Sequence, residues 1–121
     1  MRLIRTRWGV WEVETIEAEK GYGPLLYDVA LEIAFLDGAS GVIPDRSGVS
    51  TAAENVWIHY QEHRPDVRTS ALPLDYPDRN KHSLRHRPFL DLVYSKVDTP
   101  VLRALGDRFT FEPGPALVGA Q

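Results

Sequence analysis

Gly21 and Gly23 frame a short turn between a strand-forming segment and an apolar segment that begins at Pro24. A glycine turn that leads into a helix leaves backbone N–H groups without intrahelical partners. The helix dipole adds partial positive charge at the same place, so a phosphate or carboxylate is the natural ligand. Lys20 adds a full positive charge beside the turn. The spacing therefore predicts an anion-binding loop at residues 20–24.

Two carboxylates precede this loop. Glu12 and Glu14 lie two positions apart in a segment rich in β-forming residues, so a strand over residues 10–16 places both on one face. A carboxylate at such a place can take a proton from an amine, directly or through water. The alternative is that both form the solvated side of an edge strand. Glu12 and Glu14 are our candidate catalytic bases.

Two other groups of polar residues are candidates for binding. Residues 59–63 read His-Tyr-Gln-Glu-His, a zinc-protease motif in which His59 and His63 share one helix face. Such enzymes need a third metal ligand from elsewhere, so the polar flank of an amphipathic helix explains the pair better, and we predict no metal site. A basic cluster could contact a cofactor phosphate, a nucleic acid or an acidic partner, or could be solvated. Its members are His82, Arg85, His86 and Arg87.

The elements expected to position these residues define an α/β domain. Residues 24–36 and 51–63 have the composition and caps of helices, with Ser50 as the N-cap of the second. The short apolar segment 39–43 follows the first helix, so it should pair in parallel with the strand at 10–16. The other expected elements are strands at 3–8, 89–94 and 109–111, a packed loop at 66–88, and a short helix at 100–105 capped by Thr99.

The helix at 24–36 is apolar nearly all round. Its only charged residues are Asp28 and Glu32, which lie one turn apart. An apolar surface that wide requires cover on more than one side, from the sheet together with a tail or a partner subunit. The face expected to be buried comprises Leu25, Leu26, Val29, Ile33 and Leu36.

The composition is that of an ordinary single-domain protein. The 121 residues are enough for one hydrophobic core, and fractions of 43% apolar and 26% charged residues are typical. The formal charge of −3 argues against a general nucleic-acid binder. There is no cysteine for a disulfide or a thiolate site, and no apolar run is long enough to span a bilayer. We predict a cytoplasmic protein without a membrane segment.

Over about residues 8–64, the order of strand, glycine loop, apolar helix, short strand and second helix resembles the core of the GNAT superfamily of N-acetyltransferases. In that superfamily the loop binds the pyrophosphate of acetyl-CoA, with a pattern of Gln or Arg, two residues, Gly, one residue, and Gly or Ala. Both glycines match here, whereas Ala18 replaces the first polar residue. The resemblance implies acetyl-CoA as the cofactor. The residues that it implies for binding are Ala18, Lys20, Gly21, Tyr22, Gly23 and Pro24.

Two departures from the superfamily bear on catalysis. Its members commonly have a tyrosine that protonates the departing CoA thiolate, and Trp57 stands at the matching position. Tyr60, one turn later, is the candidate replacement, with core packing as its alternative role. The superfamily also has helices and strands before this core, which build the acceptor site. That half would have to come from residues 66–112 or from another subunit, or be absent.

The sequence therefore predicts a single domain, 1–121, with a reduced GNAT-like mixed sheet and about three helices. The core covers residues 8–64, followed by a loop-rich region at 65–112 and a tail at 113–121. The implied function is that of an acetyl-CoA-dependent N-acyltransferase with an unidentified amine acceptor, acting as a homo-oligomer or in a larger assembly. The alternative is a non-catalytic GNAT-like structural or interaction subunit. Small proteins of this kind also resemble ones from bacteriophage genomes, which would place the chain in a virion.

Overall fold

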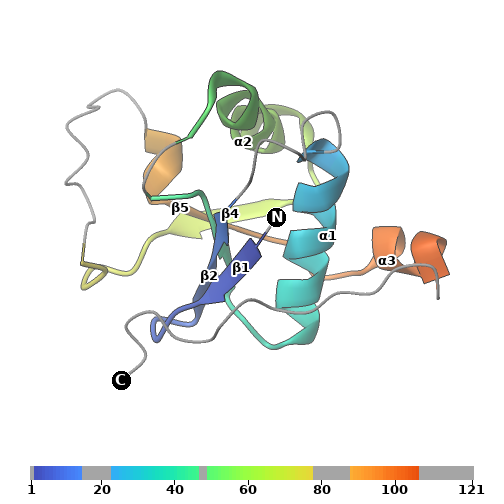
Figure 1. Cartoon of the computed structure of the whole chain (residues 1–121), viewed down its shortest axis with the longest axis horizontal. Helices are drawn as coiled ribbons and strands as arrows, with labels where there is room; N and C mark the ends of the chain where they lie inside the picture. The colour runs from blue at the N-terminus through green and yellow to red at the C-terminus, as the bar shows by residue number, and fades with distance from the viewer. Residues whose placement is uncertain (1, 15–22, 47–48, 78–87, 107–121) are drawn as a thin grey trace.

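The computed structural model of the chain describes residues 2–14, 23–46, 49–77 and 88–106. Within these ranges the fold is a mixed α+β arrangement, with a five-stranded sheet and three α-helices (Figure 1). None of the helices in these ranges has the length and apolar character needed to cross a bilayer. The fold class expected from the sequence is confirmed.

A parallel pair of strands lies inside the sheet. β2 (Val10–Glu14) and β3 (Gly41–Ile43) run parallel, as the single helix between them predicts. β1 (Arg2–Arg5) pairs antiparallel with β2 on one side, and β5 (Leu92–Ser95) pairs antiparallel with β3 on the other. β4 (Arg68–Ala71) pairs antiparallel with β5 and forms the far edge. The strand order is therefore β1-β2-β3-β5-β4.

The three helices occupy the segments that the sequence indicates. They are α1 (Gly23–Leu36), α2 (Thr51–His63) and α3 (Pro100–Leu105). Ser50 caps α2, because its side-chain oxygen accepts a hydrogen bond from the backbone N of Ala53 at 3.1 Å. Local capping signals thus identify the start of α2 without help from tertiary contacts.

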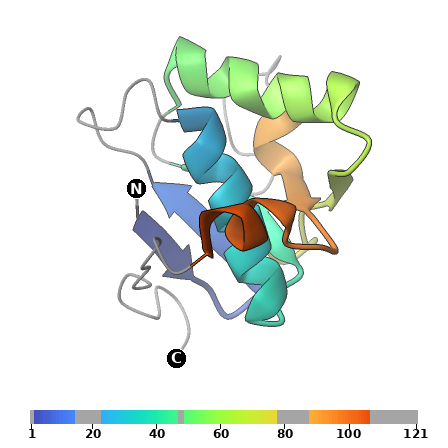
Figure 2. The same ribbon diagram turned by 90° about the vertical axis from the view of Figure 1, so that its right-hand side faces the viewer.

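α1 lies between the sheet and α3, as the two views of the ribbon show (Figures 1 and 2). The prediction that α1 is covered on more than one side is therefore confirmed. The predicted buried face is wrong at both its ends, since Leu25 and Leu36 are 44% and 66% exposed. The residues of α1 in the main core cluster lie on the opposite side of the helix from Leu25 and Leu36; they are Tyr27, Ala30, Leu31 and Ala34. The fully covered positions of α1 are Tyr27, Val29, Ala30, Leu31, Glu32 and Ala34.

Aromatic side chains form the centre of the core on the helix side of the sheet. Trp57 is 1% exposed, and its ring lies 4.8 Å from that of Tyr27, 5.9 Å from that of Tyr60 and 4.7 Å from that of Tyr94. All these rings are tilted against one another, which aromatic pairs favour. A second, smaller cluster uses the side chains that alternate with the first on the strands. It contains Val10, Ile43, Leu72, Tyr76 and Val93, with Trp8 packed against it.

Two predictions for the second half of the chain are wrong. The loop expected at 66–88 contains strand β4, and the strand expected at 89–94 begins as a 3-10 helix, η2 (Pro88–Asp91), before β5. All four residues of β4 are exposed, so no apolar alternation marks it as a strand. The strand predicted at 109–111 lies outside the described residues.

Candidate functional site

Of the predicted anion-binding loop at residues 20–24, the structure describes the last two residues, which lie at the start of α1. Gly23 and Pro24 form the first positions of this helix. The first turn carries no acidic residue, so no carboxylate of its own offsets the partial positive charge of the helix end. Of the six residues implied to bind acetyl-CoA, four lie outside the described ranges: Ala18, Lys20, Gly21 and Tyr22.

The parallel strands that flank this helix stop pairing before β2 ends. Their last paired residues are Glu12 and Ile43, whereas β2 continues to Glu14 and β3 is followed by Pro44. Beyond Glu12, β2 therefore pairs with β1 and no longer with β3. In α/β folds, ligands commonly bind at the carboxyl ends of adjacent parallel strands.

The two candidate bases differ in their surroundings. Glu12 is half-buried, and its Oε1 accepts a hydrogen bond of 2.9 Å from the backbone N of Arg46. Glu14 instead forms a surface ion pair with Arg2, with 2.9 Å between Oε1 and Nη2. Glu12 is therefore held at the last paired position of β2 and β3, while Glu14 is bound to the edge strand β1.

Arg46 fixes the segment that follows β3. Its side chain is 7% exposed, and its Nη2 lies 2.8 Å from Oδ1 of Asp91. The guanidinium also donates to the backbone oxygen of Leu90 and lies 5.6 Å from the centre of the Tyr76 ring. We call Arg46 with Glu12, Tyr76, Leu90 and Asp91 the Arg46 cluster. No sequence pattern singled it out, because Arg46 stands in an ordinary polar loop.

Tyr60, the candidate acid, is buried and already donates its proton to a carboxylate. Its hydroxyl donates a hydrogen bond of 2.8 Å to Oδ1 of Asp28. Burial raises the pKa of Tyr60 well above its usual range, and the charge of Asp28 raises it further. A phenol held in this way is a poor proton donor to a thiolate. The surroundings of Tyr60 and of buried Trp57 favour the core-packing alternative.

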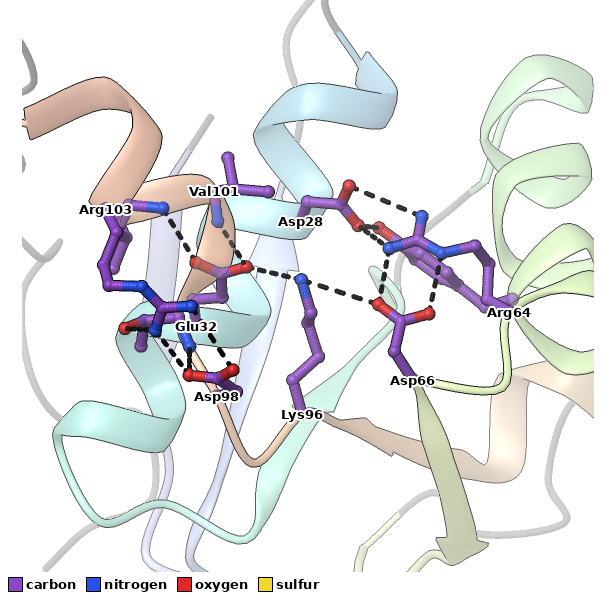
Figure 3. A network of polar contacts seen from close by, with 11 residues as sticks. Asp28, Glu32, Arg64, Asp66, Lys96, Asp98, Val101 and Arg103 are labelled. Atoms are coloured by element: carbon purple, nitrogen blue, oxygen red, sulfur yellow. Dashed lines mark hydrogen bonds and ion pairs between the residues drawn. The ribbon is translucent and has the colours of Figure 1, made fainter.

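Asp28 also belongs to a chain of ion pairs between α1 and the start of β4 (Figure 3). Arg64, directly after α2, places its Nη2 at 3.2 Å from Asp28 and at 2.8 Å from Asp66. The hydrogen bond from Arg64 holds the pKa of Asp66 below its usual range. Stability gained from Asp66 is thus present above its unfolded pKa and lost as the pH falls through the folded one.

The second charged residue of α1 lies at the other end of these contacts (Figure 3). Glu32 is 0% exposed and forms an ion pair with Lys96, which is 3% exposed. Its carboxylate also accepts hydrogen bonds from the backbone N of Val101 at 3.2 Å and of Leu102 at 2.9 Å. Thr99 occupies the predicted N-cap position of α3, but its side chain makes no capping bond, and Glu32 satisfies these donors instead. We call Glu32, Lys96 and the start of α3 the Glu32 cluster.

The histidines of the zinc-like motif are exposed and lie side by side. The ring centroids of His59 and His63 are 5.2 Å apart. Among the described residues, no three metal-ligating side chains gather in one place. The basic cluster at 82–87 lies outside the described ranges.

Comparison of the chain with protein-family models, with curated proteins and with solved structures gave no match.

Proposed function

We propose that this chain is an acetyl-CoA-dependent N-acyltransferase with a reduced GNAT-like fold. The observation that carries the proposal is the arrangement at the carboxyl ends of β2 and β3. These parallel neighbours stop pairing at Glu12 and Ile43, and β2 leads through the glycine segment into the start of α1. The Gly21–Gly23 segment supplies backbone N–H donors for a pyrophosphate, and Lys20 adds positive charge.

The reaction joins an amine to the acetyl group of the thioester. The amine nitrogen attacks the carbonyl carbon, a C–N bond forms, and the C–S bond breaks with CoA as the leaving thiolate. Glu12 is the base that the geometry favours, because the backbone N–H of Arg46 orients its carboxylate at the last paired position of the parallel strands. Glu14 is the second candidate, nearer the surface and paired with Arg2.

The proton balance closes without Tyr60. One proton leaves the amine for the carboxylate or a water molecule, and one proton returns from either of them to the CoA sulfur. The buried hydrogen bond from Tyr60 to Asp28 then stabilises the fold and takes no part in the reaction. The acceptor substrate in this proposal is an amine.

A second function is favoured by the core around Trp57. Trp57, whose indole has no titratable proton, stands where the superfamily has its acid. The hydroxyl of Tyr60 beside it already donates its hydrogen bond to Asp28. On this account the chain is a non-catalytic structural or interaction subunit, in a homo-oligomer or a larger assembly such as a phage particle. It would either bind acetyl-CoA without turnover or not bind it.

Isothermal titration calorimetry with acetyl-CoA tests the binding half of the proposal. We expect saturable heat with the unaltered chain and none with Gly23→Glu, which places bulk and negative charge at the start of α1. A carboxylate at a helix start does not oppose folding, so the variant should stay folded. Leu74→Glu is the matched control, because it adds the same charge at a side chain that is 83% exposed. Absence of heat at millimolar acetyl-CoA would exclude the proposal.

Release of the CoA thiol in the presence of a panel of amines then separates the two functions. Turnover that falls strongly in Glu12→Gln and little in Glu14→Gln supports the acyltransferase. Binding without thiol release for any amine supports the non-catalytic subunit.

A further inference from the structure

Two imidazole rings lie beside each other on the last turn of α2. His59 and His63 are four positions apart, their ring centroids are 5.2 Å apart, and their planes are inclined by 36°. Both side chains are exposed. Within the described part of the chain, neither ring makes a hydrogen bond or an ion pair, so their nitrogen lone pairs are available to a ligand from solvent.

This separation suits joint coordination of one metal ion. Two imidazoles bound to a tetrahedral cation at roughly 2.0–2.1 Å have ring centres roughly 5 Å apart. The pair is also held on a fixed backbone, because the neighbouring face of α2 is anchored in the core through Ala53, Trp57 and Tyr60. Only small side-chain rotations are needed for binding, so little conformational entropy is lost.

The surrounding charges favour a cation. His63 is the last residue of α2, where the helix dipole contributes partial negative charge. Glu62, exposed on the same turn, adds a full negative charge. Arg64 is the nearest cation along the chain, and its guanidinium is bound to Asp28 and Asp66.

We propose that His59 and His63 bind one late first-row divalent cation, Zn²⁺, Ni²⁺ or Cu²⁺, with its remaining coordination positions open to water or to an added ligand. Imidazole nitrogen suits these ions, whereas Mg²⁺ and Ca²⁺ prefer oxygen ligands. The absence of three clustered ligands in the described residues fits an open site with two protein ligands. Such a site differs from the three-ligand zinc site of a protease, because the chain supplies only the two imidazoles.

Calorimetry on the full chain, with any affinity tag removed, tests this site. We expect saturable binding of ZnCl₂ and NiCl₂ and none of MgCl₂. His59→Gln with His63→Gln should weaken binding by more than the roughly tenfold that loss of an outer-shell partner costs. The matched control is His82→Gln with His86→Gln, which removes the chain's other two histidines and should leave this binding unchanged.

A second control variant tests whether metal binding depends on the four-residue spacing of the two histidines or only on the number of histidines in the chain. His63→Gln with Gln61→His keeps four histidines but puts the two on α2 two positions apart, where they point to different sides of the helix. We expect this variant to lose binding as well. The substituted residues of α2 are exposed, but Gln61 also donates a hydrogen bond of 3.0 Å to the hydroxyl of Tyr94. Circular dichroism therefore checks that the spacing variant stays folded. Equal Zn²⁺ affinity in the His59→Gln/His63→Gln variant and the unaltered chain, or no binding at millimolar Zn²⁺, would overturn the proposal.

Discussion

The Glu32 cluster and the Arg46 cluster both place a charged side chain in the interior, but they connect different parts of the fold. Glu32 joins α1 to Lys96 after β5 and to the start of α3, on the helix side of the sheet. Arg46 joins the segment after β3 to β2 and to the end of η2, beside the carboxyl ends of the parallel strands. The two clusters therefore differ in their place relative to the carboxyl ends of the parallel strands, and only the Arg46 cluster lies where we propose that acetyl-CoA binds.

The clusters also differ in how their charges are satisfied. The Glu32 carboxylate accepts bonds from an ammonium and from two backbone donors, so its charge is compensated in a site closed to water. Removal of one partner from such a pair is costly, because the other charge stays buried. Arg46 faces Asp91, whose side chain is partly open to solvent at 23% exposure. If Arg46 is removed, water can therefore hydrogen-bond to the carboxylate of Asp91 in its place.

The largest effect is expected at Lys96. Lys96→Ala leaves Glu32 without its counter-charge in a fully covered site, and the free energy of unfolding should fall by about 3–5 kcal/mol. Urea denaturation followed by circular dichroism measures this change. The exposed Arg103→Ala serves as the control and should leave the urea midpoint nearly unchanged. A loss below about 1 kcal/mol for Lys96→Ala would show that the pair is not buried as described.

A double substitution tests the same buried ion pair between Glu32 and Lys96. Glu32→Leu with Lys96→Met removes both charges and should recover a large part of the stability, since apolar replacement of buried ion pairs is often neutral. The backbone N–H groups of Val101 and Leu102 then lack their acceptor. Hydrogen exchange at these two amides should accelerate in the double variant even where overall stability is restored.

A smaller loss, about 2–3 kcal/mol, is expected for Arg46→Ala, because charged hydrogen bonds to Leu90 and Asp91 disappear but Asp91 keeps access to water. Arg46→Lys should not restore the loss, because an ammonium cannot reproduce the planar fork of donors. Urea denaturation measures stability, and acetyl-CoA titration measures function. We expect Arg46→Ala to weaken acetyl-CoA binding at a temperature where the variant is folded. Unchanged affinity would remove the functional distinction between the two clusters.

The smallest effect at neutral pH is expected for Tyr60→Phe, about 1.5 kcal/mol, from loss of the hydrogen bond to Asp28. Its clearer signature is at high pH. The folded-state pKa of Tyr60 lies above the ordinary value of 10.0, so its contribution to stability is present below about pH 10 and is lost as the pH rises towards the folded value. In Tyr60→Phe the decline of stability above pH 10 should be shallower by about 1.4 kcal/mol per pH unit. Urea midpoints between pH 9 and 11, an interval of roughly one unit either side of the free pKa, measure it. An unchanged slope would contradict the assigned protonation state.

Much of the first half of the fold could be predicted because its signals are local. The parallel pairing of β2 and β3 follows from one helix between two strands, and Ser50 identifies the start of α2 by itself. These are the parts of the candidate site that the sequence could position.

The rest depends on contacts between distant residues. Glu32 caps α3 across 69 and 70 positions of sequence, and Arg46 reaches residues 44 and 45 positions away. No local pattern encodes such partners. β4 is an exposed edge strand of mostly polar residues. Its composition therefore does not predict a strand, and only its pairing with β5 makes it one. The stripe of α1 that is buried also depends on where the sheet and α3 lie, which helical periodicity cannot supply.

We propose that acetyl-CoA binds at the carboxyl ends of β2 and β3 and at the start of α1, and not at the Glu32 cluster. An NMR titration of the ¹⁵N-labelled chain with acetyl-CoA tests this directly. We expect saturable amide shifts concentrated at Gly23, Glu12 and Arg46, with little change at Lys96, Val101 and Leu102. Shifts centred on the start of α3, or no shifts at millimolar acetyl-CoA, would contradict it.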